Sequence, residues 1–182
     1  MTGWAALRWA EFSYEGRKYD LTHLRRKTVS YIRPAKGKDS SRVYAVDVVF
    51  SFHCFTHERR DKETPAPELL LKDGHETRVF DFGRWELSNR LPGIIAGLMD
   101  RKCFHAGRSN YVTVELMSNT TVIRYSVFFE VSRASRKGAL NLYVQSAHVR
   151  DLPGGKQRHN PPIAFAFILH NTLNKIVIRT PK

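Results

Sequence analysis

The sequence predicts an α+β fold, a curved antiparallel sheet of five or more strands with helices packed on one face. Between residues 111 and 151, apolar residues alternate with period two, which is the pattern of a sheet with one buried face. Residues 42–57 carry a second long strand signal, rich in β-branched and aromatic side chains. Residues 84–102 instead repeat their apolar side chains at helical spacing, and we expect this stripe to pack on the sheet.

Three consecutive strands are expected between residues 111 and 151, with the sequences YVTVELM, VIRYSVFFEVS and LNLYVQSAHV. Their connections are short, a turn at 118–120 and a basic loop at 133–138 that ends in glycine, which favours an antiparallel meander. One row of side chains is apolar and is expected to be core. The opposite row is polar and carries the rings of Phe128 and Tyr143, so we expect function on this face or at its rim.

The chain before the meander also predicts strands. Residues 11–24 predict a small hairpin around Glu15-Gly16, and residues 28–32 predict a strand that leads into a basic loop at 33–38. In the strand expected at 42–57, alternation places His53, Phe55 and His57 on the face opposite the core. Residues 61–77, with two prolines and a glycine, predict a loop.

The helix expected at 84–102 contains Pro92, which either kinks it or opens its second half, since proline is tolerated at a first helical position. After a basic loop at 152–161, residues 162–175 fit a second helix, although the phenylalanine-rich start also fits a strand. Residues 176–179 are expected to close the fold as a short edge strand. No change of composition marks a boundary, so we expect one domain over residues 1–182.

The chain is strongly basic, because thirty Lys and Arg stand against seventeen Asp and Glu and give a formal charge of +13. Such a charge favours attraction to polyanions. RNA or another single-stranded nucleic acid is therefore the first partner to consider. A basic but inert surface and an interface for an acidic protein partner remain open as alternatives.

The sequence also predicts a soluble, cytoplasmic protein without a membrane partner. Its two cysteines cannot make a disulfide framework, and no segment is long and apolar enough to cross a bilayer. The first residues lack the basic region and the extended apolar run of a signal peptide.

His53 and His57, followed by Arg59 and Arg60, form the densest cluster of titratable groups in the sequence. A metal site would need a further ligand, such as Asp47, His75 or His105. Residues four apart on a strand stand about 13 Å from each other at ~3.3 Å per residue, too far to share one ion. We therefore expect no bound metal and no cofactor.

The polar row of the meander suggests phosphodiester chemistry. Cleavage of RNA through its own 2′-hydroxyl needs a general base, a general acid and cations for the phosphorane charge. Glu130, Arg124 and His148 are the predicted catalytic residues, with His53 and His57 as alternative acid and base. By strict alternation His148 belongs to the core-facing row, so it joins the site only if the strand ends or bulges there.

Binding of a single strand needs rings on which bases stack and cations that contact phosphates. The predicted stacking residues are Phe128, Tyr143 and Phe55, and the predicted phosphate contacts are Arg59, Arg133, Arg136, Lys137 and Arg150. The same set suits a binding module without catalysis, and the charge alone suits a regulatory protein that binds an acidic partner. The sequence has no GxSxG, HExxH or kinase motif, which argues against serine hydrolases, zincins and kinases.

A Phe-Phe-Glu-Val strand at 128–131 and a Ser-Ala-His-Val-Arg strand at 146–150 follow a helix in a basic chain of this size. This arrangement resembles the metal-independent ribonucleases of the barnase, colicin and RelE toxin group, over residues 84–151 at most. The resemblance implies a toxin-like endoribonuclease, a hydrolase that acts on RNA without a metal. The N-terminal half, with its histidine-bearing strand, departs from that pattern.

Overall fold

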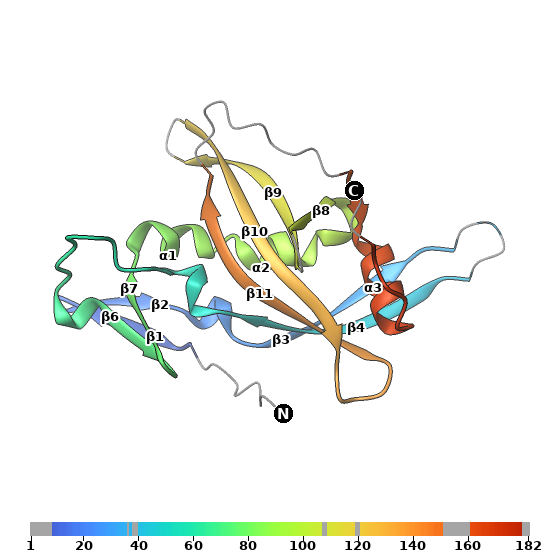
Figure 1. Cartoon of the computed structure of the whole chain (residues 1–182), viewed down its shortest axis with the longest axis horizontal. Helices are drawn as coiled ribbons and strands as arrows, with labels where there is room; N and C mark the ends of the chain where they lie inside the picture. The colour runs from blue at the N-terminus through green and yellow to red at the C-terminus, as the bar shows by residue number, and fades with distance from the viewer. Residues whose placement is uncertain are drawn as a thin grey trace.

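The computed structural model describes residues 9–35, 37, 40–106, 109–118, 121–150 and 161–179. The fold is α+β, as predicted, and its main sheet has seven strands in the order β12-β8-β9-β10-β11-β4-β3. Figure 1 shows the long curved strands β10 and β11 crossing the molecule, with α2 behind them. None of the helices in the described ranges is long and apolar enough to span a membrane.

The predicted meander is confirmed as β9 (Ser109–Ser118), β10 (Thr121–Arg133) and β11 (Ala139–Val149), which pair antiparallel in sequence order. The turn expected at 118–120 lies mostly outside the described residues. The sheet is mixed and not antiparallel throughout, because β11 runs parallel to β4 (Arg42–Phe50). Parallel neighbours need a long crossover, which here includes both α1 and α2.

A β-bulge interrupts the pairing of β10 with β11. Phe128 pairs with Ser146, whereas the next residue, Phe129, pairs with Val144. The extra residue, Gln145, shifts the alternation of every later side chain on β11. Ala147 is therefore buried in the core, and the ring of His148 lies on the opposite face.

The N-terminal hairpin is confirmed as β1 (Glu11–Tyr14) and β2 (Arg17–Asp20). Its two turn residues, Glu15 and Gly16, both have positive φ, which is the type I′ geometry that suits a two-residue hairpin. A 3₁₀ turn, η1 (Thr22–Leu24), leads into β3 (Lys27–Arg33), the strand expected at 28–32, which pairs antiparallel with β4. Most of the basic loop after β3 is described, but Lys36 and Lys38 lie outside the described residues.

The single strand predicted at 42–57 is wrong beyond Phe50. The chain turns through η2 (Phe52–Cys54), where the Ser51 hydroxyl accepts a hydrogen bond from the His53 amide at 3.1 Å, and then forms β5 (Thr56–His57). The turn ends the alternation on which the face assignment depended. Phe55, predicted to stack on bases, is fully buried with 0% exposure.

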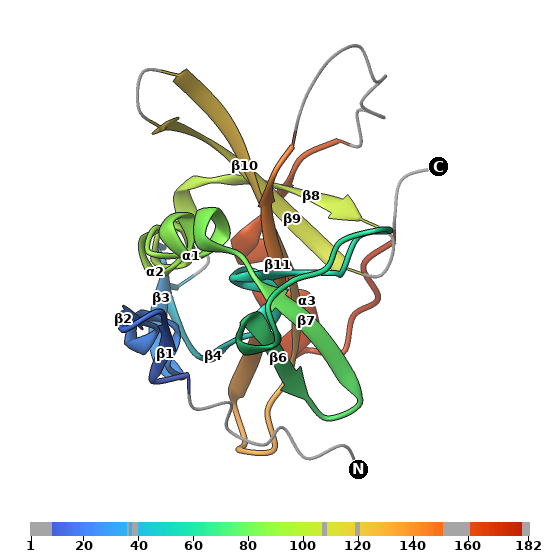
Figure 2. The ribbon, with the colours of Figure 1, turned by 90° about the vertical axis from the view of Figure 1, so that its left-hand side faces the viewer.

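Part of the loop predicted at 61–77 is ordered structure. After η3 (Pro67–Leu69), strands β6 (Leu70–Asp73) and β7 (Glu76–Phe80) form a hairpin, and β5 pairs with β7 to complete a three-stranded sheet. The glycine of the loop, Gly74, occupies the hairpin turn with φ +57°, which favours glycine. This small sheet and the β1–β2 hairpin lie at the same end of the molecule (Figures 1 and 2).

The predicted long helix is two short ones, α1 (Phe82–Ser88) and α2 (Leu91–Ala96), followed by η4 (Leu98–Asp100). Pro92 lies in the first turn of α2, so the proline opens the second half. The segment then enters an unpredicted strand, β8 (Lys102–Ala106). The second predicted helix is confirmed as α3 (Phe165–Leu173), preceded by β12 (Ile163–Ala164), while residues 176–179 form no strand.

Helices α2 and α3 cover the core face of the sheet. The hydroxyl of Tyr31 donates to the carbonyl oxygen of Ile95 over 2.7 Å, which joins β3 to α2. The ring of Phe165 at the start of α3 packs edge-on against Tyr31 at 5.0 Å and Phe129 at 5.9 Å. We call the opposite face of β10 and β11 the outer face.

Candidate functional site

The β-bulge brings three groups together on the outer face of β10 and β11. The ring of His148 stacks on Phe128 with centroids 5.4 Å apart and an interplanar angle of 12°. The guanidinium carbon of Arg150 lies 5.1 Å from the centroid of the same phenyl ring, a cation–π contact. We call Phe128, His148 and Arg150 the Phe128 group.

Burial lowers the pKa of His148, and the positive charges of Arg84 and Arg150 lower it further. Both effects disfavour the charged imidazolium. His148 is therefore a neutral imidazole at pH 7, with two guanidinium groups near enough to act on it.

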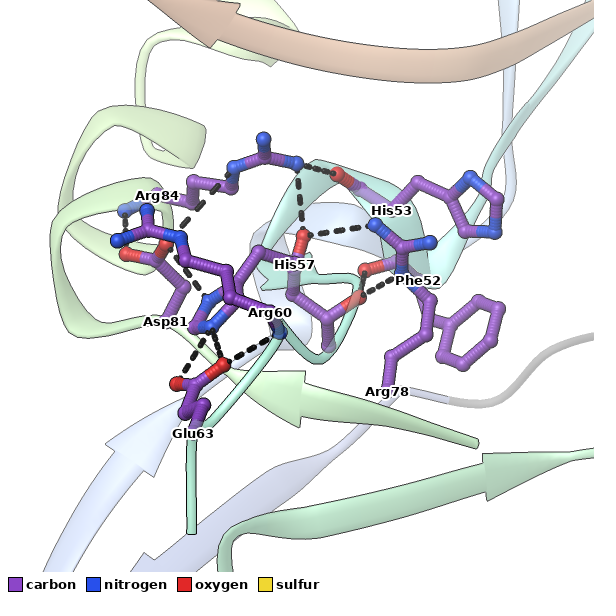
Figure 3. A network of polar contacts seen from close by, with 9 residues as sticks. Phe52, His53, His57, Arg60, Glu63, Arg78, Asp81 and Arg84 are labelled. Carbon is purple, nitrogen blue, oxygen red and sulfur yellow. Dashed lines mark hydrogen bonds and ion pairs between the residues drawn. The ribbon is translucent and has the colours of Figure 1, made fainter. Parts of the chain in front are cut away.

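Arg84 in α1 connects the helix to the turn that contains η2. Its Nη1 donates to the carbonyl oxygens of Thr56 at 2.8 Å and His53 at 3.3 Å (Figure 3). Burial lowers the pKa of Arg84, but a guanidinium stays charged in proteins. Arg84 is therefore a half-buried link between α1 and the turn at η2.

His57 is held between two carboxylates (Figure 3). Its Nδ1 lies 3.1 Å from Oδ2 of Asp81, and its Nε2 lies 3.0 and 3.2 Å from the two carboxylate oxygens of Glu63. Both hydrogen bonds form together only when both ring nitrogens carry a proton. His57 thus ties β5 to the start of α1 and to the following loop, and neither nitrogen is left for a substrate.

The two carboxylates that hold His57 also accept hydrogen bonds from backbone amides. Asp81 is the N-cap of α1 and accepts the Arg84 amide at 3.0 Å. Glu63 accepts the Arg60 amide at 2.8 Å, and this bond, together with the one from His57, lowers the pKa of Glu63. The cluster is consequently a structural clamp.

His53, the other histidine of the predicted pair, belongs to a second cluster. Its Nε2 lies 3.0 Å from Glu76, and Glu76 also accepts a hydrogen bond from Arg78 at 3.0 Å. Arg78 is 9% exposed, donates to the Thr56 hydroxyl at 2.9 Å and lies over the Phe52 ring at 5.9 Å. Burial raises the pKa of Glu76, but the bonds from His53 and Arg78 outweigh it and lower the pKa overall.

The predicted catalytic set does not converge on one point. Arg124 and Glu130 both lie on β10, six residues and therefore about 20 Å apart at ~3.3 Å per residue. Arg124 pairs with Glu115 at 3.4 Å, and Glu130 accepts a hydrogen bond from Gln145 at 3.3 Å. Among the predicted catalytic residues, His148 is the one whose pKa is lowered by two guanidinium groups, those of Arg84 and Arg150.

The predicted binding residues fall at both ends of the β10–β11 ribbon. Arg133, Arg136 and Lys137 are exposed at the loop end, where Arg136 lies 3.9 Å from Asp47. Arg150 lies at the other end with the Phe128 group, and half-buried Tyr143 lies between. Arg59 is exposed but belongs to the Glu63 loop, where its Nε donates to the Glu63 carbonyl at 2.9 Å.

The sequence reasoning missed Asp81, Glu63 and Arg78. An N-cap signal was present, because an aspartate immediately before the apolar spacing of a helix is typical of a helix start. Nothing in the sequence pairs Glu63 with His57 or Arg78 with Thr56, because these contacts depend on how η2 and the β6–β7 hairpin pack.

Within the described ranges, no three His, Cys, Asp or Glu side chains are grouped so as to hold a metal ion. Cys54 and Cys103 are free and buried, and burial raises the pKa of each thiol to about 12. Both therefore stay protonated at neutral pH and are poor nucleophiles. The basic loop expected at 152–161 lies outside the described residues up to Asn160.

A family model for the YjaZ family matches residues 11–173. The chain belongs to the YjaZ family. No curated protein and no solved structure matches the chain.

The YjaZ family match begins at the first residue of β1 and ends at the last residue of α3. It therefore includes every strand and helix described above. The matched region contains the Phe128 group. It also contains the contacts of His57 with Asp81 and Glu63 and the contacts of Glu76 with His53 and Arg78.

Proposed function

We propose that this YjaZ family protein binds single-stranded nucleic acid, RNA in the first instance, on the outer face of β10 and β11. The observation that carries the proposal is the Phe128 group, in which the imidazole of His148 stacks on the Phe128 ring and the guanidinium of Arg150 makes a cation–π contact with it. Planar aromatic and guanidinium groups are the surfaces on which unpaired bases stack.

Cations lie at both ends of the same pair of strands. Arg150 and Arg84 act at one end of the ribbon, and Arg133 and Lys137 are exposed at the other. From Ser126, which pairs with His148, to Arg133 the strand covers seven residues, about 23 Å at ~3.3 Å per residue. A strand of several nucleotides would contact cations at both ends and stack on rings between them. The formal charge of +13 adds long-range attraction.

The direct test is fluorescence anisotropy with a labelled twelve-nucleotide uridine RNA. We expect Phe128→Ala and Arg150→Gln each to weaken binding by about tenfold, since stacking of one base contributes about 1–3 kcal/mol. Arg17→Gln is the matched control. Arg17 is exposed on the separate β1–β2 hairpin, and the substitution removes one positive charge, as Arg150→Gln does. Equal weakening by all three variants would overturn the proposed surface in favour of diffuse charge.

Cleavage of the bound RNA is a second candidate, favoured by one observation. His148 is neutral at pH 7, and the charges of Arg84 and Arg150 act on it. A neutral imidazole can serve as the general base, and the two guanidinium groups can stabilise the negative charge of the phosphorane. His53 and His57 are already engaged by carboxylates. We expect cleavage of RNA that continues in EDTA, does not extend to DNA and is lost in His148→Ala. If RNA stays intact between pH 5 and 8, the protein binds RNA without cleaving it.

We also propose a cytoplasmic location for this function. The two cysteines are buried free thiols, which fits a reducing compartment. Alkylation of the denatured protein, taken from cells without reductant, would show both thiols free if the location is right.

A further inference from the structure

A cavity of about 380 Å³ lies at the edge of the main sheet, away from the outer face of β10 and β11. It is formed by three parts of the chain: β8 and β12, the first turn of α3, and the segment after α3. Two consecutive prolines before β12 also contribute. The side chains that matter for the argument are His105, Ile163, Phe167, Val177, Ile178 and Arg179.

The walls of this cavity are apolar and exposed. Phe167 is 51% exposed and Val177 is 81% exposed, although Phe165, two residues earlier, is fully buried in the core. Apolar area exposed to water is unfavourable, so a ligand that covers these side chains gains free energy from their burial. Neighbouring exposed apolar side chains around a hollow are typical of a binding site.

The permanent charge in the lining of the cavity is positive. Arg179 and His105 line it, and among the described lining residues none is acidic. An apolar ligand with a negative group would therefore cover the apolar side chains and pair with the positive charge of Arg179.

We propose that this cavity binds a small apolar carboxylic acid. Its hydrocarbon part lies against Phe167, Ile163 and Val177, and its carboxylate pairs with the guanidinium of Arg179. A guanidinium offers two parallel N–H donors to a carboxylate, which makes this pair stronger than a neutral hydrogen bond.

The size of the cavity limits the class of ligand. Small-molecule sites range from about 300 to 1,000 Å³, and this cavity is near the lower limit. A hollow of this volume holds the hydrocarbon part of a medium-chain fatty acid or an arylalkanoic acid. The cavity shares no residue with the proposed nucleic-acid surface, so the two proposals fail separately.

Decanoate is the probe for the test, with the full chain labelled with ¹⁵N and followed by NMR. We expect saturable shifts of the amides of Phe167, Val177 and Arg179, with a Kd of about 0.1–1 mM. Decanol carries the same chain without the charge and is expected to bind about tenfold more weakly, since a charge-assisted hydrogen bond is absent.

Two substitutions complete the test at exposed positions, where the fold tolerates change. Arg179→Gln is expected to weaken decanoate about tenfold and to leave decanol unchanged, and Val177→Asp to weaken both. Arg17→Gln is the matched charge control and should change neither. Shifts that never saturate, or that spread over the basic surface and respond equally to Arg17→Gln, would overturn the site. Equal affinity for decanol and decanoate would overturn the acidic ligand.

Discussion

The Nδ1 atom of His57 lies 3.1 Å from Oδ2 of Asp81, and this contact joins β5 to the N-cap of α1. Asp81 also accepts the Arg84 amide, so one carboxylate fixes the start of the helix and the ring of the histidine. Arg84 in turn donates to the carbonyl oxygen of Thr56, beside His57. The arrangement holds the charge of Arg84 where it acts on His148.

The first prediction concerns this N-cap. We expect Asp81→Ala to lower the free energy of unfolding by about 2 kcal/mol, since the variant loses a cap and leaves His57 without one partner. Urea denaturation measures the change. Asp61→Ala, at an exposed carboxylate in the neighbouring loop, is the control and should change stability little. Equal stability of both variants would show that Asp81 is not a cap in solution.

Much of the sheet follows from the sequence because its periodicity is strong. The meander, the N-terminal hairpin and α3 were all predicted from alternation, turn residues or helical spacing. Phe55 was assigned to the wrong face because the 3₁₀ turn η2 interrupts the strand alternation. The local signal for this turn is Ser51, whose hydroxyl accepts a hydrogen bond from the His53 amide. Period-two reasoning fails wherever one residue is inserted or a strand ends early.

His148 depends on the same kind of irregularity. Regular alternation assigns it to the core, and the extra residue at Gln145 moves it to the outer face beside Phe128. A bulge is set by packing on both strands and has no reliable sequence signal. The clamp residues were missed for a related reason, since Glu63 reaches His57 only through the folded loop.

The second prediction is the protonation of His148. Its pKa is lowered by burial and by Arg84 and Arg150, so the unfolded chain binds more protons than the folded one just below the ordinary imidazole value of 6.5. Stability from this group is therefore present above 6.5 and is lost as pH falls from 6.5 through the lower pKa of the folded protein. NMR titration of the His148 ring protons measures the pKa directly.

Arg150→Gln provides the matched change for this titration. Removing one positive charge should raise the pKa of His148 toward 6.5, while burial and Arg84 keep it below that value. Arg17→Gln removes the same charge at a distance and should leave the titration unchanged. A His148 that titrates identically in both variants would contradict the contact with Arg150.

The third prediction concerns acid stability at Asp47. The Thr28 hydroxyl donates to Asp47 at 2.6 Å and Arg26 donates at 3.0 Å, and these bonds lower the pKa of the carboxyl below its ordinary value of 3.8. The unfolded chain then binds more protons than the folded one as pH falls past 3.8, so the stabilisation is present above that value and lost below it.

Asp47→Asn is expected to lower stability at pH 7 by about 1–2 kcal/mol and to flatten the loss of stability as pH falls below 3.8. Urea denaturation across this range measures both effects. Thr28→Val tests the hydroxyl contribution separately, because it removes the 2.6 Å bond but keeps Arg26. If Asp47→Asn loses stability with acid as steeply as the unsubstituted protein, Asp47 does not have a lowered pKa.

The last prediction separates phosphate contact from stacking on the proposed RNA surface. Arg133 and Lys137 are exposed at the loop end of the β10–β11 ribbon, where they would contact phosphates, and Phe128 lies toward the other end. Each phosphate contact on a single strand contributes about −0.7 to the slope of log K against log salt concentration. The double variant Arg133→Gln/Lys137→Gln should therefore make this slope shallower by about 1.4.

Phe128→Ala should weaken RNA binding at every salt concentration without changing the slope, because stacking releases no counterions. The double variant Arg17→Gln/Lys18→Gln on β2 removes the same two charges and controls for net charge. Anisotropy titrations at four salt concentrations supply all four slopes. A slope reduced as much by the β2 variant as by the loop variant would mean that RNA does not follow the β10–β11 ribbon.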